Sequence, residues 1–271
     1  MVRALFLGAC MAATGWVQAQ RVVPPAPFVL GVVETIRSQA LGQDRLLNII
    51  LPQGYHADTA ASYPVLYVLD GSADEDIIHV AGAVQFASFP WIAWLRPCIV
   101  VGIANVDRKH DLTHPTTIAK DKETFPTTGG SEAFLRFVGD EVVPFIAANY
   151  RASDQRTLIG QSLGGLFATE VLLRRPALFQ HYLIVSPSLW WDNGSVLQLP
   201  PTALMDPAQA PATVYVAVGK EHPTMVRGAR QLAALVRRNH HTRVGHAQLT
   251  HLDHATILHQ AVVDWMVWRG K

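Results

Sequence analysis

Five short, almost continuously apolar runs alternate with helical patterns along this chain, and this alternation restricts its fold more than any other feature. The runs are PVLYVLDG, CIVVGIAN, RTLIGQS, HYLIVSPS and TVYVAVG, at residues 64–71, 98–105, 156–162, 181–188 and 213–219. Strands this apolar are typical of a parallel sheet whose two faces are both covered by helices. Amphipathic helical patterns occur at residues 131–150, 163–175, 224–239 and 255–268. The alternation therefore predicts an α/β domain.

Two extended patterns precede these runs, and one follows them. Residues 28–38 and 44–52 are joined by a short connection, which predicts an antiparallel hairpin. Residues 243–250 add a last strand. We expect a mostly parallel central sheet of about eight strands with an antiparallel N-terminal hairpin and helices on both faces. The looser segment 198–212 is interpreted as a surface excursion and not as a domain boundary.

The first residues have the pattern of a secretory signal peptide. Arg3 supplies a positive charge, an apolar stretch follows it, and Ala19 is a small residue that allows cleavage before Gln20. We therefore predict a signal peptide at 1–19 and a single domain at 20–271. A periplasmic or secreted location follows from this prediction.

Charge and cysteine content narrow the range of partners. The formal net charge is +1, which disfavours nucleic acid or an anionic membrane as the main partner. After the signal, no segment is long and apolar enough to span a bilayer, so no stable membrane insertion is expected once the signal is removed. Cys10 lies in the signal, which leaves Cys98 without an internal disulfide partner, and we interpret Cys98 as a packed apolar residue. The oligomeric state is not assigned.

One turn at the end of a predicted strand has the pattern of a nucleophile. Residues 160–164 read Gly-Gln-Ser-Leu-Gly and fit G-x-S-x-G, in which the serine occupies a strained strand-to-helix turn. The glycines are needed there because a side chain would collide with the neighbouring strand and helix. Sites in open α/β sheets form beyond the carboxyl ends of the strands, which is where Ser162 is expected. We predict Ser162 as the nucleophile, against the alternative of an idle serine in a Gly-rich turn.

A serine hydroxyl needs a general base, and the chain order in this class of site is Ser, then Asp or Glu, then His. His254 follows the last predicted strand and precedes the final helix, so we predict it as the base. His251 is the second candidate, whereas His259 falls inside the helix. The His-x-x-His spacing of His251 and His254 lacks further ligands at helical spacing, so we predict no metal and no cofactor.

The acid that orients this base has two candidates. Glu221 directly follows the strand at 213–219, and Asp192 follows the preceding strand. Asp253 is too close in sequence to His254 to reach beneath its ring. A Ser-His dyad without a carboxylate is the third alternative.

An oxyanion hole requires two backbone N–H donors. We predict one from Leu163, the residue after the nucleophile. The second is expected from the loop after the strand at 64–71, where Gly71 and Ser72 are the candidates. Asp70 is interpreted as an anchor of this loop.

The motifs together are similar to those of a known family. In chain order the sequence contains LYVLDG, VGIAN followed by DRKHDLTHPT, GQSLGGLFATEVLLRRP, SPSLWWD, VAVGKE and LDHATIL. From about Phe28 onward, this series resembles the "putative esterase" branch of the α/β-hydrolases, which includes esterase D-like enzymes and trilactone siderophore esterases. The resemblance implies the α/β-hydrolase fold and a serine hydrolase that acts on ester bonds.

The resemblance also implies roles for individual residues, and it keeps Ser162 and His254 in the roles given above. It places Arg108 near the oxyanion and the substrate. Trp190 and Trp191 resemble the family's aromatic pair, for which a substrate-binding role and a core role are both open. The chain departs from the family at His114, which stands where relatives often have Thr-Pro directly, so the geometry of this loop is not carried over.

The expected function is an exported serine esterase that hydrolyses carboxylic esters through an acyl-enzyme, with ferric-siderophore trilactones as candidate substrates. The alternatives are a generic short-chain carboxylesterase and an acyltransferase on the same scaffold. Arg108 and Lys109 suggest an entrance that tolerates anions. A binding module without catalysis would have no need for both Ser162 and His254. The expected partner is a small-molecule ester.

Overall fold

The computed structural model describes residues 23–57 and 59–270. Of these, residues 31–57 and 59–270 belong to one compact unit, and residues 23–30 belong to a separate one. The described part of that first segment, residues 23–30, contains no helix or strand. The predicted signal peptide at 1–19 and the predicted start of the domain at residue 20 both lie outside the described residues.

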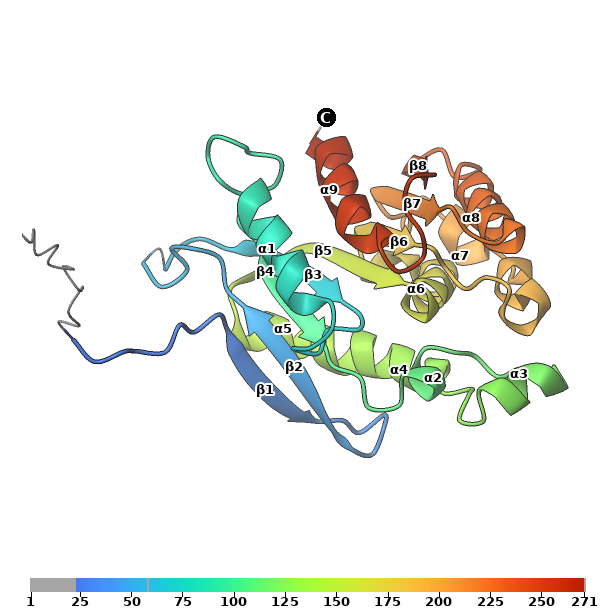
Figure 1. Ribbon diagram of the computed structural model, residues 1–271, viewed down its shortest axis with the longest axis horizontal. Helices are drawn as coiled ribbons and strands as arrows, with labels where there is room; N and C mark the ends of the chain where they lie inside the picture. The colour runs from blue at the N-terminus through green and yellow to red at the C-terminus, as the bar shows by residue number, and fades with distance from the viewer. Residues whose placement is uncertain (1–22, 58, 271) are drawn as a thin grey trace, which may run out of the picture. The chain divides into compact units, whose positions relative to one another are not determined.

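The compact unit is built on one eight-stranded sheet, in the order β1-β2-β4-β3-β5-β6-β7-β8 (Figure 1). β1 pairs with β2 and β2 with β4 in antiparallel fashion, and all other neighbours are parallel. The mostly parallel sheet and the antiparallel N-terminal hairpin are therefore confirmed. The strands are β1 (Val32–Arg37), β2 (Asp44–Ile50), β3 (Tyr63–Val68), β4 (Ile99–Ile103), β5 (Ala152–Gln161), β6 (His181–Val185), β7 (Thr213–Gly219) and β8 (Arg243–Leu249).

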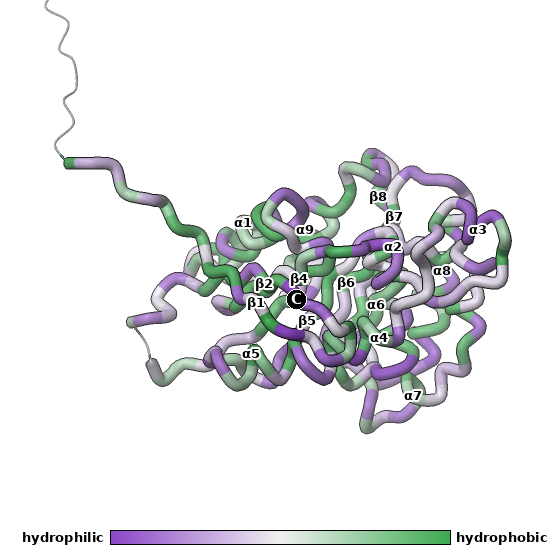
Figure 2. Tube along the Cα trace, turned by 90° about the horizontal axis from the view of Figure 1, so that it is seen from below, coloured by the Kyte–Doolittle hydropathy of each residue, from purple (hydrophilic) through white to green (hydrophobic). Residues whose placement is uncertain are grey.

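The central strands bury both of their faces, which is why their sequences are almost continuously apolar. In β3, Val65 and Tyr67 pack into one core, whereas Leu66 and Val68 pack into another on the opposite face. All the residues of β4, β6 and β7 are buried. The segment around α3 (Ala119–Thr124) differs from these buried strands, because its residues are mostly hydrophilic (Figure 2).

Helices cover the sheet on both faces, as predicted. Residues of α1 (Ile77–Ala87) and α9 (Ile257–Gly270) belong to one core. Residues of α4 (Ser131–Arg136), α5 (Val143–Asn149), α6 (Leu163–Arg174) and α8 (Pro223–Val236) belong to the other, together with a π-helical stretch at Phe137–Val142. The remaining short helices are α2 (Arg108–Asp111) and α7 (Thr202–Met205), with 3₁₀ turns at Pro176–Leu178 and Trp191–Gln198.

Two features differ from the simple strand–helix alternation of the sequence. α1 was not among the predicted helices, because its sequence, IIHVAGAVQFA, has no polar stripe: apolar Ile78 and Phe86 are exposed while Val80 and Val84 are buried. The segment 198–212, interpreted as a surface excursion, contains the one-turn helix α7. Among the described residues, no helix has the length and apolarity that a membrane crossing requires.

Candidate active site

Ser162 lies in a sharp turn between β5 and α6. Its φ is +59° and its ψ −117°, a left-handed conformation that is costly for a residue with a side chain. The turn is held on both sides, because Ser162 N–H donates to the Val185 carbonyl at 3.0 Å and the Ser162 carbonyl accepts from Leu166 N–H at 3.0 Å. Strand and helix thus fix a strained backbone that directs the serine side chain away from the sheet.

The glycines around this turn are required by close backbone contacts. A Cβ atom on Gly160 would lie 2.4 Å from the Gly164 carbonyl oxygen, and one on Gly165 would lie 2.9 Å from Cα of Pro187. Gly164 has more room, since the nearest atom to a Cβ there is a side-chain oxygen of Asp70 at 3.3 Å. The collision that the sequence pattern predicted therefore exists at Gly160 and is milder at Gly164.

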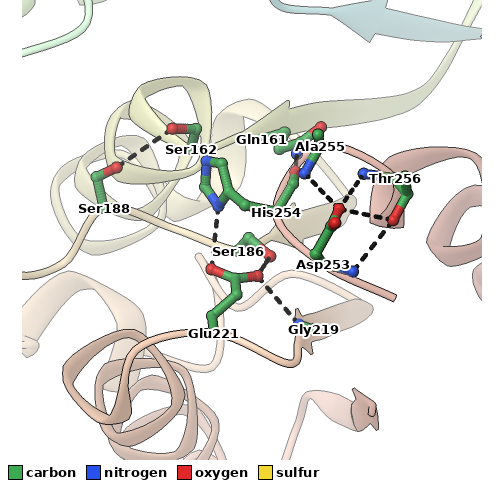
Figure 3. Close-up of polar contacts among 10 residues, drawn as sticks. All are labelled: Gln161, Ser162, Ser186, Ser188, Gly219, Glu221, Asp253, His254, Ala255 and Thr256. Atoms are coloured by element: carbon green, nitrogen blue, oxygen red, sulfur yellow. Dashed lines mark hydrogen bonds and ion pairs between the residues drawn. The ribbon is translucent and has the colours of Figure 1, made fainter. Parts of the chain in front are cut away.

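The structure brings His254 and Glu221 together beside Ser162. Glu221 follows β7, and His254 lies in the loop between β8 and α9. The His254 Nδ1 atom is 3.0 Å from Glu221 Oε2. Figure 3 shows the His254 ring between Ser162 and Glu221, with its second nitrogen turned toward Ser162. Residues from three strand ends thus meet in the order serine, imidazole, carboxylate.

The Glu221 carboxylate is held by a set of donors. Oε1 accepts hydrogen bonds from Ser186 Oγ and, at 3.1 Å, from Gly219 N–H, while Oε2 faces His254 (Figure 3). Burial by itself would raise the pKa of Glu221, but the hydrogen bonds with His254, Ser186 and Gly219 outweigh it and hold this pKa below its ordinary value. Glu221 is therefore charged, and it can orient an imidazole and stabilise its protonated form.

The other candidates for the acid and the base lie in other surroundings than the Ser162–His254 pair. Asp192 Oδ1 accepts from Thr116 Oγ1 at 2.9 Å and from Thr117 N–H at 3.0 Å, so Asp192 fastens a loop. The Asp253 carboxylate accepts from the backbone of the residues that lead into α9. His251 is exposed in a turn, and His259 lies within α9, where its ring centroid is 5.9 Å from that of His79.

Three polar residues of the site were missed by the sequence analysis. Ser188 Oγ lies 3.4 Å from Ser162 Oγ, Ser186 Oγ donates to Glu221, and Gln161 Nε2 donates to the His254 carbonyl. Ser186 and Ser188 come from the segment SPS directly after β6, the strand between β5 and β7. Their position at that strand end was the signal that could have found them.

The predicted oxyanion donors differ in their availability. Leu163 is the first residue of α6, so its N–H has no partner within the helix and faces the same end as the nucleophile. Gly71 N–H donates to the Ile103 carbonyl at 3.0 Å, and Ser72 N–H donates to Glu75 Oε2 at 3.1 Å. The geometry thus leaves Leu163 as a donor and shows both candidates for the second donor engaged, Gly71 with the end of β4 and Ser72 within its own loop.

Arg108 lies at the site but is bound to a carboxylate. Its Nε donates to Asp70 Oδ1 at 2.6 Å and its Nη2 to Asp70 Oδ2 at 2.8 Å, a bidentate pair. Asn105 Nδ2 also donates to Asp70, at 2.7 Å. Burial alone would lower the pKa of Arg108, but the Asp70 pair raises it overall. Asp70 therefore acts as the loop anchor that was predicted, and Arg108 shares this role.

Two hollows meet at Ser162 and His254. One, of about 350 Å³, is lined by Arg108, Gln161 and the acidic residues Asp70, Glu75 and Asp76. The other, of about 390 Å³, is lined by Ser188, Trp190, Lys220, His222, Met225 and Asp253. An ester carbonyl at Ser162 therefore has room for one substituent on each side.

The tryptophan pair divides between pocket and core. Trp190 is 37% exposed and lines the second hollow. Trp191 is fully buried and donates through Nε1 to the His114 carbonyl at 2.9 Å. His114, where the chain departs from the family pattern, thus supports the loop that carries Trp190. Lys109, predicted at an entrance, lies over the ring of Phe125 at 4.9 Å.

Within the described residues, no group of three or more His, Cys, Asp or Glu side chains is placed to hold a metal ion. The side chains that do converge are those of an acyl-transfer site: a hydroxyl on a strained turn, an imidazole and a buried carboxylate. On this sheet, with the serine between β5 and α6, they define the α/β-hydrolase fold.

The family is shown by comparison with known proteins. A family model described as "Putative esterase" matches residues 38–271. The chain therefore belongs to the putative esterase family, and the resemblance seen in the sequence motifs is confirmed.

Individual relatives are similar over differing lengths. The ferri-bacillibactin esterase BesA of Bacillus subtilis is 30% identical over 184 residues, which are 63% of this chain and 63% of that protein. The chain thus spans less than two thirds of the length of this curated relative. Among solved structures, the BES protein of Bacillus cereus is 26% identical with a TM-score of 0.78 over 93% of this chain and 99% of that one. An IroE-like serine hydrolase from Shewanella oneidensis is 25% identical with a TM-score of 0.76 over 88% of this chain and 79% of that one.

Proposed function

We propose that this protein is a serine esterase that cleaves carboxylic esters through an acyl-enzyme on Ser162. The observation that carries the proposal is the Ser162–His254–Glu221 arrangement, in which the His254 Nδ1 atom is 3.0 Å from a buried carboxylate and the other ring nitrogen is turned toward Ser162. Membership of the putative esterase family supports the same reaction class.

The proposed reaction has two halves. In the first, His254 takes the hydroxyl proton as Ser162 Oγ bonds to the ester carbonyl carbon, and the proton then passes to the alcohol oxygen as the carbon–oxygen bond breaks. In the second, His254 takes a proton from water, the hydroxide attacks the acyl group, and the proton returns to Ser162 as the acid leaves. Leu163 N–H is the donor available to the oxyanion, and Glu221 keeps the imidazole oriented.

For the substrate, we propose a ferric-siderophore trilactone. The names of similar proteins support this class, since one is called a ferri-bacillibactin esterase and another a siderophore enterobactin esterase. The test is a hydrolysis panel that compares ferric and iron-free trilactone siderophores with short-chain aryl esters. A higher kcat/KM for trilactones is expected. A strong preference for aryl esters would favour a generic carboxylesterase, and a new ester formed in preference to free acid when alcohols are added would favour an acyltransferase.

We also propose that the protein is exported, on the basis of the signal pattern at 1–19. Expression of the full chain in bacterial cells, followed by fractionation and N-terminal sequencing, tests this. A mature form that begins near Gln20 in the periplasm or medium is expected, whereas an uncleaved chain in the cytoplasm would refute the proposal.

A further inference from the structure

A second surface of the molecule exposes aromatic side chains that the proposed reaction does not use. The segment 86–95, here called the aromatic loop, consists of the last two residues of α1 and the first part of the connection to β4, which projects beyond the end of α1 (Figure 1). Trp91 is 75% exposed and Phe86 is 46% exposed. Exposed rings gathered in one loop are unusual for a protein surface and generally indicate an interaction site.

The aromatic loop is an ordered structure, not a loose connection. Its backbone turns back on itself, because Ile92 and Ala93 N–H donate to the Phe89 carbonyl at 2.9 and 2.8 Å, and Trp94 N–H donates to the Ala87 carbonyl at 2.9 Å. The rings are also fixed. Phe89 stacks on Trp91 with 4.8 Å between centroids. The rings of Phe86 and Trp94 lie 5.8 Å apart, edge to face. The fold thus holds the rings in place at a tip.

The chain around the aromatic loop lacks acidic residues. From Ile77 to Val106 the sequence contains no Asp or Glu. Arg96 follows the loop, is exposed, and takes part in none of the ion pairs found among the described residues. Arg96 is therefore the one Lys, Arg, Asp or Glu residue between Ile77 and Val106, so this stretch has a formal charge of +1.

The end of α9 extends this surface. Gly270 lies against Trp94, since a Cβ on Gly270 would be 3.1 Å from the Trp94 carbonyl oxygen. Nearby on α9, Trp268 lies under the guanidinium of the exposed Arg243 at 4.2 Å, whereas the guanidinium of Arg269 lies over the buried ring of Trp265 at 5.6 Å. The acidic residue on this helix is Asp264, whose carboxylate accepts from Gln260 at 2.7 Å. The patch therefore combines the exposed rings of the aromatic loop with the exposed arginines Arg96 and Arg243.

The patch lies at the N-terminal ends of the parallel strands, and the catalytic site lies at their C-terminal ends. The aromatic loop precedes the N-terminal end of β4, whereas Ser162 follows the C-terminal end of β5. β4 and β5 both run parallel to β3, so their N-terminal ends lie on one side of the sheet and their C-terminal ends on the other. A surface that contacted the aromatic loop would therefore leave the opening at Ser162 facing away from it.

We propose that the aromatic loop docks the protein peripherally on an anionic lipid bilayer. Tryptophan and phenylalanine rings insert at the boundary between headgroups and acyl chains. There an indole buries its apolar ring surface while its N–H group remains hydrated. Arg96 and Arg243, which are exposed, attract the anionic headgroups, each attraction adding to the binding. No crossing of the membrane is involved, and Ser162 remains open to dissolved substrate.

Sedimentation with lipid vesicles tests this proposal without any substrate, so its outcome is independent of the proposed esterase function. The purified protein is mixed with vesicles of phosphatidylethanolamine and phosphatidylglycerol, or of phosphatidylcholine alone. Binding to the anionic vesicles is expected, weaker at high salt and weaker on phosphatidylcholine. Trp91→Ser should lower the partition constant about tenfold or more, and Arg96→Gln about fivefold.

Ile78→Ser provides the matched control, because Ile78 is 51% exposed at the other end of α1. Its binding should equal that of the unmodified protein. Three outcomes would overturn the proposal: no binding to anionic vesicles, equal losses from Trp91→Ser and Ile78→Ser, or a lipid-free dimer that Trp91→Ser dissociates. The last result would assign the patch to contact between copies of the chain.

Discussion

At the residue scale, Glu221 explains why a dyad is not the arrangement that the structure favours. Its carboxylate is buried and accepts from Ser186, Gly219 and His254. Its lowered pKa keeps it charged, so the stabilisation that its charge contributes is present above the ordinary pKa of a glutamate and is lost only as the pH falls through the lowered value. A charge fixed in this way beneath His254 holds the ring in one tautomer.

Glu221→Gln should therefore lower kcat for ester hydrolysis by about 10²–10⁴-fold with little change in KM, because the residue acts on the imidazole and not on the ground-state substrate. Steady-state kinetics on a soluble aryl ester measure this. Asp192→Asn is the control, since Asp192 fastens a loop through Thr116 and Thr117, and it should retain most of the turnover. A larger loss in Asp192→Asn than in Glu221→Gln would contradict this account.

At the element scale, the junction of β5 and α6 depends on close backbone approach. Gly160 and Gly164 both belong to the G-x-S-x-G pattern, yet a Cβ would meet a carbonyl oxygen at 2.4 Å in the first and a side-chain oxygen at 3.3 Å in the second. Backbone atoms cannot give way as a side chain can. The two glycines thus differ in their structural roles, which the motif does not reveal.

Gly160→Ala is expected to lower the free energy of unfolding by roughly 1–3 kcal/mol, as overpacking in a core does, and Gly164→Ala by less. Urea unfolding followed by circular dichroism compares the two variants. Equal destabilisation, or a larger effect at Gly164, would show that the turn relaxes in a way the backbone contacts do not indicate.

The start of β6 carries a buried histidine that should make folding sensitive to acid. His181 contacts Thr213 Oγ1 at 2.9 Å, and burial lowers its pKa to about 3, with a smaller effect of Arg269. The unfolded chain, with an ordinary pKa of about 6.5, binds more protons than the folded one between these values. Stability should therefore fall as the pH decreases from about 6.5 toward 3.

His181→Gln should flatten this dependence, whatever it does to stability at neutral pH. The measurement is the urea midpoint across that pH range. His251→Gln, at an exposed position in a turn, should leave the slope unchanged. An unaltered slope in His181→Gln would mean that another group dominates the acid response.

The sequence predicted the elements that have one clear pattern and missed those that do not. β3 to β7 were predicted because burial on both faces makes them almost wholly apolar, and α8 because its apolar residues form a stripe. α1 was missed because it exposes Ile78 and Phe86 and so lacks that stripe.

Chain order identified Ser162, His254 and Glu221 as candidates for the site. The strand end at SPS marked Ser186 and Ser188 as candidates, but their contacts with Glu221 and Ser162 depend on where β6 lies between its neighbours. The engagement of Arg108 by Asp70 likewise depends on loop geometry, so these contacts could not be predicted.

At the scale of the whole molecule, the order of strands creates the site. β5, β6, β7 and β8 are consecutive neighbours and run in the same direction. Ser162, Glu221 and His254 follow the C-terminal ends of β5, β7 and β8. Residues from distant parts of the chain therefore lie together on one side of the sheet. The side chains between them come from the end of β6. Cooperation between Ser162 and His254 is therefore a property of the complete sheet.

Covalent labelling with a fluorophosphonate, followed by peptide mapping, measures this cooperation most directly. A single adduct on Ser162 is expected in the unmodified protein, none in Ser162→Ala, and labelling slowed by about a hundredfold or more in His254→Ala, since general base catalysis typically contributes that much. An adduct on a different serine, or an unchanged labelling rate in His254→Ala, would contradict the account.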